Sequence, residues 1–358
     1  GNNAIGNYEW QAVYNSAKYA FGGSLNNGLA ITSISNNLLE WESTAITNIG
    51  IDFATLRNRL TFEAEFYNKV TDGILYRPDM YMSLGTASGP RQNIAEVTNR
   101  GIEMTLNWQD RIGKVEYRVS GNFAYNQNKV SKYKGELQRG WVTDENGNRV
   151  YQTNIGDVST GGSTRVIEGK MINEYYMLQP YKGNGNGFNA DGTVNINGGP
   201  RDGMIRTVDD MKWLNAMVGA GYKFYPRQNV SKSGIWYGDY IYADSNNNGV
   251  YGDDNDYTFQ KTSNKPKYNF GFQASAAWKG FDLGVLLQGV GKRNFYLSSE
   301  VMNPYYATWN NFSYKMHNDY WTPENPNAAF PRYYAGANHN YQISDHWLQN
   351  AAYVRLKN

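Results

Sequence analysis

The feature that most constrains the fold of this chain is a run of segments between residues 44 and 130 in which apolar and polar residues alternate. In residues 47–53, Ile49, Ile51 and Phe53 take every second position, and polar or small residues fill the positions between them. A period of two is that of a β-strand whose two faces meet different surroundings. The stretch therefore predicts consecutive antiparallel strands with one apolar and one polar face. The same period recurs at 60–67, 102–108 and 115–123.

The connections between the alternating segments are short and long in strict succession. The short ones are 56–59, 110–113 and 279–280, and the long ones are 18–43, 77–93, 131–266 and 297–345. A β-sandwich carries loops of mixed length at both of its ends, whereas a transmembrane barrel has short turns at the periplasmic end and long loops outside. The order of the connections therefore favours an all-β fold, a transmembrane antiparallel β-barrel with long extracellular loops.

This interpretation predicts eight strands and one very large extracellular loop at 131–266. The predicted strands lie near 7–14, 44–53, 60–76, 95–109, 114–130, 267–279, 281–296 and 346–357. The last of them has no return partner in the chain, and an open strand edge in lipid costs several kcal/mol for each unpaired backbone group. We therefore expect the chain to be part of a larger barrel.

In a barrel of this kind the apolar residues face lipid and the polar residues face a wet interior. The outward set is Ile49, Ile51, Phe62, Phe66, Met104, Leu106, Val119, Phe123, Leu283 and Val285. The interior set is Asn48, Asp52, Glu63, Glu65, Glu103, Asn107, Glu116 and Arg118.

The composition agrees with a barrel better than with a dry globular core. Among 358 residues there are 30 tyrosines, 10 tryptophans and 38 glycines, which suits aromatic girdles and long wet loops. The longest apolar run falls well below the ~18 residues that a spanning helix needs, so any membrane span must be a strand. A net charge of +2 gives no reason to expect nucleic acid as a partner. The absence of cysteine excludes disulfides and thiolate metal sites.

The sequence contains few of the motifs that are typical of enzymes. Its three histidines, His317, His339 and His346, do not have metal-ligand spacing. Glycine-rich nucleotide motifs and a nucleophile elbow are absent from any strand-to-helix context. Glu63 and Glu65 are a pair of carboxylates such as a glycosidase uses, but the same two-residue spacing is what charges facing a lumen require. We predict that the chain is not an enzyme.

Five longer motifs are spread along the whole chain. They are LEWESTAITNIGIDF at 39–53, NRL and YNKVTDGIL within 58–75, NIAEVTNRGIE at 93–103, PKY, WKGFDL and QGVG within 266–291, and SDHWLQNAAYVRLKN at 344–358. Taken together and in this order, they resemble the C-terminal barrel portion of the SusC/RagA-type TonB-dependent outer-membrane transporters of the Bacteroidetes.

The resemblance implies a barrel of about 22 strands in the outer membrane of a Gram-negative bacterium, of which this chain would supply roughly eight. It implies active import of oligosaccharides or, as the alternative, of oligopeptides. Energy would come through TonB acting on a plug domain that is not in this chain. The other implied partners are a SusD-like surface lipoprotein over the extracellular mouth, a second copy of the transporter–lipoprotein pair, and membrane lipid.

Two further interpretations remain open from the residues themselves. A self-contained eight-stranded barrel would pair the strand near 7–14 with the strand near 346–357. A secreted glycan-binding β-protein would instead bury outward residues such as Ile51, Phe62 and Leu106 against a second sheet.

The long loops are dense in aromatic residues flanked by Asn, Asp and Arg. Flat rings stack on the C–H faces of sugars while neighbouring polar groups bind the hydroxyls. For any single ring, packing of the loops or a place at the membrane interface is the better explanation. As a group, the rings offer four candidates for substrate contact: Trp213, Trp236, Tyr237 and Trp309.

Residues 244–256 resemble a calcium-binding loop, with oxygen side chains at positions 1, 3 and 5 and a glycine at position 6. Position 12 is Asn255, however, where such a loop has a bidentate glutamate. The sequence favours the alternative, a turn held by side-chain to backbone hydrogen bonds. If Ca²⁺ binds, its candidate ligands are Asp244, Asn246, Asn248, Asp253 and Asp256.

Overall fold

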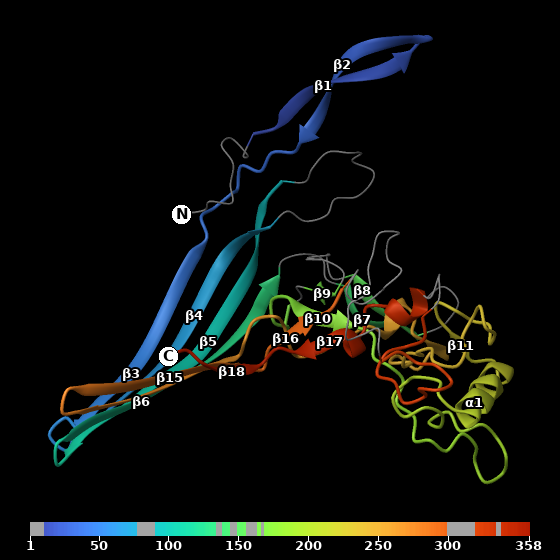
Figure 1. Cartoon of the computed structure of the whole chain (residues 1–358). Helices are drawn as coiled ribbons and strands as arrows, with labels where there is room; N and C mark the ends of the chain where they lie inside the picture. Colours follow the sequence, from blue (N-terminus) through green and yellow to red (C-terminus); the bar gives the residue numbers. More distant parts are fainter. Residues whose placement is uncertain are drawn as a thin grey trace.

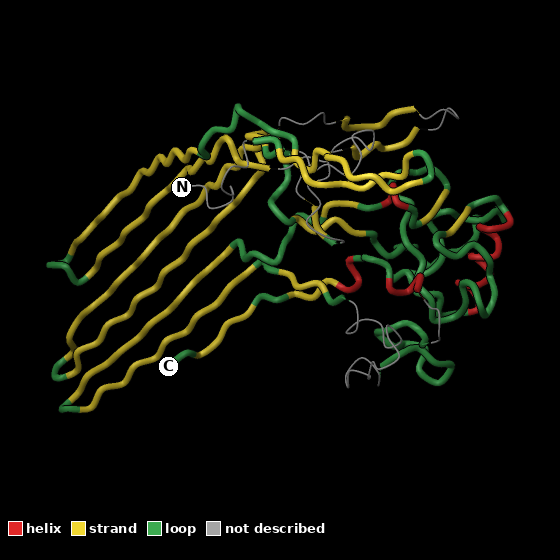
Figure 2. Tube along the Cα trace, turned by 90° about the horizontal axis from the view of Figure 1, so that it is seen from above, coloured by secondary structure: helices red, strands yellow, loops and turns green. Residues whose placement is uncertain are grey.

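The computed structural model describes residues 11–76, 90–133, 138–143, 149–154, 163–165, 168–298, 319–333 and 338–358. Its largest element is a seven-stranded antiparallel sheet with the order β18-β15-β14-β6-β5-β4-β3. The strands are β3 (Ser43–Thr55), β4 (Leu60–Tyr76), β5 (Gln92–Ile112), β6 (Val115–Tyr133), β14 (Tyr268–Trp278), β15 (Phe281–Gly291) and β18 (Tyr353–Leu356). They lie side by side in Figure 2, joined by tight turns at one end.

The register of the sheet sorts its residues into an apolar and a polar face. Because side chains alternate between faces, residues that are paired across strands point to the same side. One row on the apolar face is Phe53, Phe62, Leu106, Gly121, Phe272, Leu287 and Leu356. One row on the polar face is Thr61, Asn107, Ser120 and Gln273. The predicted outward and interior sets fall on opposite faces in this register.

The apolar face is not covered by other parts of the described chain. Ile51 is 64% exposed and Leu106 is 50% exposed, and neither Phe62 nor Phe123 is buried. A secreted β-protein with its outward residues packed against a second sheet is therefore contradicted.

The sheet is open among the described residues, because β3 and β18 each pair with one neighbour only. The self-contained eight-stranded barrel requires the N-terminal strand to pair with the C-terminal one. Val13 and Tyr14, the described end of the predicted strand at 7–14, instead pair with Ser33 and Ile31. The small closed barrel is thus not what these residues form.

Residues 18–43 are predicted as a long loop, and this prediction is wrong. They contain most of a hairpin formed by β1 (Val13–Phe21) and β2 (Ser24–Ser33), which projects beyond the end of β3 in Figure 1. Gly22 and Gly23 turn the chain with φ angles of 60° and 79°. Glycine adopts such angles without steric cost, which allows the two-residue turn.

The predicted strands at 281–296 and 346–357 are also each interrupted. β15 ends at Gly291, and a separate strand β16 (Asn294–Tyr296) pairs with β17 (Leu348–Asn350). A short 3-10 turn, η5 (Asp345–Trp347), precedes β17, so only β18 continues the large sheet. The chain leaves the sheet here because Lys292, with φ of 50°, turns it away.

The described residues of the predicted loop 131–266 are largely folded. Together with residues 319–333 and 338–347 they form the loop body, which lies at the end of the sheet away from the tight turns (Figure 1). Its helix α1 (Val208–Gly219) begins at Thr207, whose side chain forms a capping box with Asp210. Its short strands are β7 (Gln138–Thr143), β8 (Arg149–Asn154), β9 (Thr164–Arg165), β10 (Glu174–Met177), β11 (Lys223–Phe224), β12 (Val250–Tyr251) and β13 (Thr258–Phe259), and its 3-10 turns are η2 (Asp254–Asp256) and η4 (Asn338–Tyr341).

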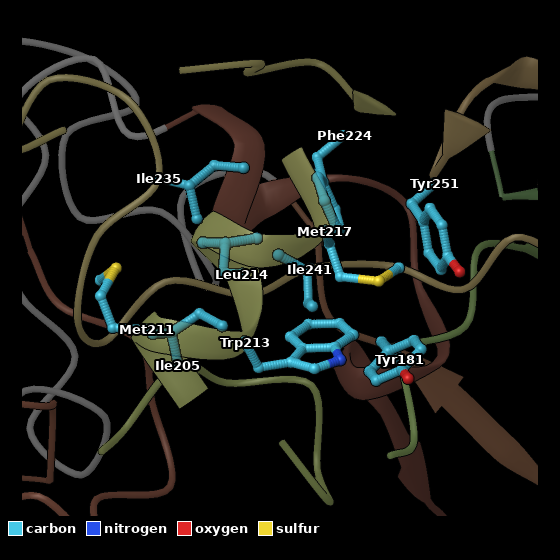
Figure 3. Packing of buried hydrophobic residues seen from close by; sticks show 10 residues of the cluster. All are labelled: Tyr181, Ile205, Met211, Trp213, Leu214, Met217, Phe224, Ile235, Ile241 and Tyr251. Atoms are coloured by element: carbon cyan, nitrogen blue, oxygen red, sulfur yellow. The ribbon is translucent and has the colours of Figure 1, made fainter. Parts of the chain in front are cut away.

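The main hydrophobic core lies in the loop body rather than on the sheet. Figure 3 shows side chains of α1 packed against aromatic residues from the surrounding loops. The cluster consists of Tyr181, Ile205, Met211, Trp213, Leu214, Met217, Phe224, Ile235, Ile241 and Tyr251. Among the described residues, no helix is long and apolar enough to cross a membrane.

Candidate functional site

The polar face of the sheet carries a network of hydrogen bonds close to the tight turns. Asn107 donates to Thr61 over 3.2 Å, and Ser120 donates to Asn107 over 2.5 Å. Two hollows of about 490 Å³ and about 440 Å³ lie on this face and share Gln109 and Arg118. Polar groups therefore line a wet surface on this side of the sheet.

Four carboxylates on this face stand directly opposite one another. Asp52 pairs with Glu63 across β3 and β4, and Glu65 pairs with Glu103 across β4 and β5. All four side chains are exposed, and none of them forms an ion pair within the described residues. Like charges placed opposite each other are unfavourable unless water or a partner screens them. These four carboxylates therefore concentrate negative charge locally on this part of the face.

Trp213, one of the four aromatic candidates for substrate contact, lies inside the loop body. It is fully buried, and its indole Nε1 donates to the backbone oxygen of Asn195 over 2.8 Å. Gly199 lies against its ring, so closely that an added Cβ would come within 2.4 Å of the indole. Trp213 therefore packs in the core of the loop body, together with Met211, Leu214 and Met217 of the same helix.

Trp236 and Tyr237 are half-buried and belong to a group of three rings. The centroids of Trp236 and Tyr237 lie 5.3 Å apart in an edge arrangement, and Tyr237 stacks on Trp321 at 6.2 Å with an interplanar angle of 10°. Trp321 lies against Gly238, where a side chain would strike the ring. We call Trp236, Tyr237 and Trp321 the aromatic group. Trp309 lies outside the described residues.

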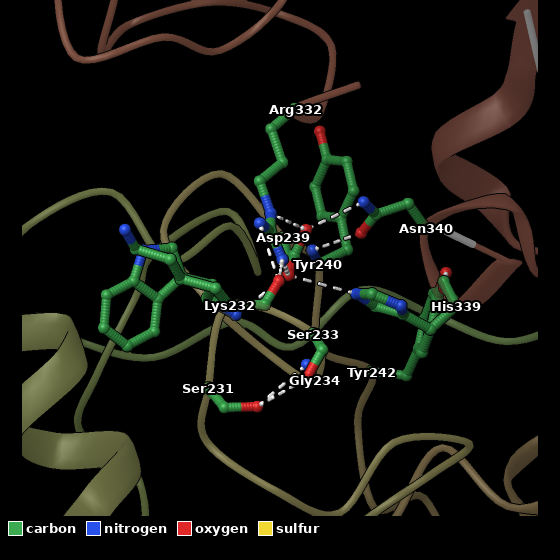
Figure 4. A network of polar contacts seen from close by, with 11 residues as sticks. Ser231, Lys232, Ser233, Gly234, Asp239, Tyr240, Tyr242, Arg332, His339 and Asn340 are labelled. Carbon is green, nitrogen blue, oxygen red and sulfur yellow. Dashed lines mark hydrogen bonds and ion pairs between the residues drawn. The ribbon is translucent and has the colours of Figure 1, made fainter. Parts of the chain in front are cut away.

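A polar network beneath this group was not expected from the sequence. Asp239 is fully buried and accepts two hydrogen bonds from the guanidinium of Arg332, at 2.7 Å and 2.6 Å. Asn340 donates to the same carboxylate over 2.9 Å, and the His339 Nε2 lies 3.2 Å from it (Figure 4). Burial alone would raise the pKa of Asp239, but the contacts with His339 and Arg332 outweigh it and hold the pKa below its usual value.

The network positions the aromatic group. Trp236 donates its backbone N–H to Asp239 over 2.8 Å, so the carboxylate fixes the turn that carries Trp236 and Tyr237. Arg332 and Asn340 come from segments that are about a hundred residues further along the chain. Neither residue belongs to a local motif, and no pattern in the sequence indicates this pairing.

The candidate calcium loop holds itself through its own backbone. Asp244 accepts hydrogen bonds from the N–H groups of Asn248 and Gly249 at 3.0 Å and 2.8 Å. Asp256 accepts from Ser245 at 2.6 Å and from Gly252 at 2.7 Å. The side chains of Asn246, Asn248 and Asp253 likewise accept from the N–H groups of Asn248, Val250 and Asn255.

Asp256 is the acidic residue of this loop whose pKa is shifted most clearly. Burial, with Asp253 and Asp244 close by, raises the pKa of Asp256 to about 7, although its hydrogen bonds from Gly252 and Ser245 oppose the shift. Within the described part of the chain, His, Asp and Glu side chains do not gather in a group of three that could hold a metal ion. The side-chain oxygens of this loop accept hydrogen bonds from backbone N–H groups, as they do in an Asx-rich turn.

Comparison with known proteins shows what this chain is similar to. The family model described as "TonB dependent receptor-like, beta-barrel" matches residues 6–159. TonB-dependent receptor P3 of Formosa agariphila is 24% identical over 361 residues, which cover 100% of this chain and 30% of that protein. TonB-dependent receptor SusC of Bacteroides thetaiotaomicron is 28% identical over 168 residues, which cover 46% of this chain and 16% of that protein.

The fold is also that of solved structures. The structure of the RagAB peptide importer in the "open-open" state aligns with a TM-score of 0.63 and 20% identity, covering 100% of this chain and 32% of the other. The structure of the RagAB peptide transporter aligns with a TM-score of 0.60 and 21% identity, over the same shares of the two chains. The chain thus spans less than a third of the length of these relatives. The resemblance to the barrel portion of SusC/RagA-like TonB-dependent receptors that the sequence indicates is thus confirmed, and that family is one of receptors and transporters rather than enzymes.

Proposed function

We propose that the chain forms part of the barrel of a SusC-like transporter that imports oligosaccharides across the outer membrane of a Gram-negative bacterium. The observation that carries this proposal is the two-faced sheet, whose apolar face stays exposed across its strands. Exposed apolar area of this extent is costly in water and is favourable against hydrocarbon. The similarity of the chain to the barrels of TonB-dependent receptors supports the same placement.

The polar face would then line the passage through which a hydrated cargo moves. Its amides and carboxylates exchange hydrogen bonds with water and with a polar ligand without a large desolvation cost. The loop body lies at the end of the sheet opposite the tight turns (Figure 1), which is the extracellular end in a barrel of this type. Cargo would therefore meet the loop body before it enters the lumen.

The proposed partners are those that the family implies. A SusD-like lipoprotein would enclose the cargo from outside, so that two surfaces together supply an affinity that neither supplies alone. TonB would provide energy through a plug domain, and membrane lipid would surround the apolar face. Two transporter–lipoprotein pairs would associate. Calcium in the loop 244–256 is a lesser proposal, since the oxygens there are already engaged by backbone N–H groups.

The aromatic group supports a glycan as cargo. Its rings are only half-buried, and sugar C–H faces stack on the exposed parts of aromatic rings. The second candidate is an oligopeptide, which is favoured by the likeness to structures of a peptide importer. Both candidates would use the same barrel and the same energy source.

Uptake measurements distinguish the two cargoes. In a strain that lacks the gene for the complete transporter, uptake of labelled oligosaccharides should be lost and should return when the wild-type gene is restored. Uptake of labelled oligopeptides of similar mass should be unchanged in the same strain. Loss of peptide uptake with unchanged oligosaccharide uptake would replace the first candidate by the second.

A further inference from the structure

A cavity of about 650 Å³ lies beside the N-terminal end of α1 in the loop body. Its volume is within the range of about 300–1,000 Å³ that is usual for sites of small ligands. The residues that matter for its chemistry are Phe188, Gly199, Arg201, Asp202, Arg206 and Asp209. None of the substrate candidates that the sequence indicates lines this cavity.

Glycine backbone forms one wall of the cavity. An added Cβ on Gly199 would strike the Trp213 ring at 2.4 Å, and one on Gly187 would lie 3.2 Å from the Trp213 Cβ. A side chain is therefore excluded at Gly199 and would be crowded at Gly187, and with glycine at both positions a ligand meets the backbone directly. The wall is held in place by hydrogen bonds such as that from Gly185 N–H to the Gly199 oxygen, at 3.1 Å.

Arg201 presents a guanidinium without a fixed partner. It lies across Gly185, where an added Cβ would come within 2.9 Å of the Arg201 Nε. Within the described residues the Arg201 side chain makes neither a hydrogen bond nor an ion pair, so its five N–H donors can serve a ligand. Arg206 is different, because it donates to Asp202 at 2.9 Å and 2.7 Å and to the Pro326 oxygen at 2.7 Å.

The charges around the cavity nearly cancel. Arg206 is paired with Asp202, and Lys212 with Asp209 at 3.0 Å. Asp210 accepts from the backbone N–H groups of Arg206 and Thr207, and its charge is balanced overall by that of Arg201. A ligand without net charge, but with many donors and acceptors, suits such surroundings.

An exposed ring completes the lining. Phe188 is 45% exposed and offers a flat apolar face next to these polar groups. A pyranose ring combines a C–H face with hydroxyls that both donate and accept, which matches a ring, an unpaired guanidinium and a carboxylate in one cavity. A peptide bound by strand addition would instead need an open strand edge and pockets for alternate side chains.

We propose that this cavity binds one neutral sugar residue of the oligosaccharide cargo. The sugar ring stacks on Phe188, Arg201 donates to its oxygens, and Asp209 accepts from one of its hydroxyls. This inference rests on the proposed import of oligosaccharides and names the residues that recognise the cargo outside the barrel.

The test uses the complete purified transporter and two sets of probes, namely hexasaccharides of glucose, mannose, xylose and galactose, and a set of peptides of similar mass. For the hexasaccharide that binds best, Phe188→Ala and Arg201→Ala should each weaken binding by about tenfold or more, since each removes a stacking face or a charged donor. The control is Ile196→Ala, an exposed residue of the same segment that does not line the cavity, and it should bind as the wild type does.

The outcomes separate the two proposals. If the wild type binds a hexasaccharide and both cavity variants bind it equally well at unchanged melting temperature, the cavity assignment is wrong while glycan import stands. If Arg201→Ala melts at a lower temperature than the wild type, Arg201→Lys serves as a second variant, because it keeps the positive charge. Arg201→Lys should then bind the hexasaccharide more tightly than Arg201→Ala does. Equal affinity of these two variants overturns the assignment of the cavity as a sugar site. If the wild type binds peptides and none of the hexasaccharides, both proposals fail.

Discussion

The guanidinium of Arg332 donates two hydrogen bonds, of 2.7 Å and 2.6 Å, to the carboxylate of Asp239, although 93 positions separate the two residues in the chain. Planar bidentate pairs of this kind are strong and directional. Asp239 also receives the backbone N–H of Trp236. The ion pair between Asp239 and Arg332 thus connects two segments of the loop body. One is the turn that carries the aromatic group, and the other is the C-terminal segment that carries Arg332.

Replacing Asp239 by Asn should destabilise the loop body by about 3–5 kcal/mol, because Arg332 would be left as an uncompensated buried charge. The loss is measured as a shift of the urea midpoint followed by tryptophan fluorescence. Asp209→Asn removes an exposed ion pair with Lys212 and serves as the control, which should change stability little. Equal effects of the two variants would contradict the structural role of Asp239.

Gly199→Ala should cost about 2–5 kcal/mol, since the new methyl group overlaps the Trp213 ring and the backbone has φ of 70°. Gly192 has a similar φ of 83° but nothing within 4 Å of its Cβ position. Gly192→Ala should therefore show the backbone cost alone, about 1–2 kcal/mol. Thermal melting of the two variants separates overlap from backbone strain, and a smaller loss for Gly199→Ala would exclude the close contact.

His346 should make the loop body less stable in acid. Its side chain is packed against Tyr240, at 4.4 Å between ring centroids, and burial lowers its pKa to about 4, with smaller effects of Asp202 and Arg206. The unfolded chain binds a proton near pH 6.5, whereas the folded protein does not until about pH 4. Stability therefore falls as the pH drops from about 6.5 to about 4, by up to about 3 kcal/mol.

The His346→Gln variant isolates this contribution. Other titrating groups are common to both proteins, so they cancel when the unfolding free energy of the variant is subtracted from that of the wild type. The difference should be constant above pH 7 and should shrink toward acid. A difference that does not depend on pH would show that His346 is not buried in its neutral form.

Leu106→Arg should impair insertion of the complete barrel into lipid by about 2–4 kcal/mol, because it places a charge on the apolar face. The neighbouring Thr105→Arg puts the same charge on the polar face, next to Glu63 and Asn122, and should be tolerated. Folded fractions in lipid vesicles at increasing urea give the comparison. Equal tolerance of both substitutions would mean that the apolar face does not meet hydrocarbon.

Calcium at millimolar concentration should leave the melting temperature of the loop body unchanged, since the loop 244–256 is already held by its backbone hydrogen bonds. Asp256→Ala should lower that temperature, because it leaves buried N–H groups unpaired at about 1–3 kcal/mol each. A rise with Ca²⁺ that disappears in Asp256→Ala would support the metal site instead.

The sequence by itself determined the strands of the sheet and their two faces. Alternation is a local property, and Ile49, Ile51 and Phe53 share a face in any β-strand because successive side chains point to opposite sides. Each pairing with a neighbouring strand then preserves that division, which is why the outward and interior sets agree with the register.

Only the tertiary structure decided which aromatic residues are buried. Trp213 and Trp236 both lie in the segment 131–266 that the sequence predicts as a loop. Trp213 is enclosed by glycines from a segment before helix α1, whereas Trp236 stays half-exposed. The pairing of Asp239 with Arg332 and the cavity beside α1 arise in the same way, from segments brought together by folding. Burial and charge pairing depend on contacts between residues that are far apart in the sequence, and such contacts cannot be predicted from a local sequence pattern.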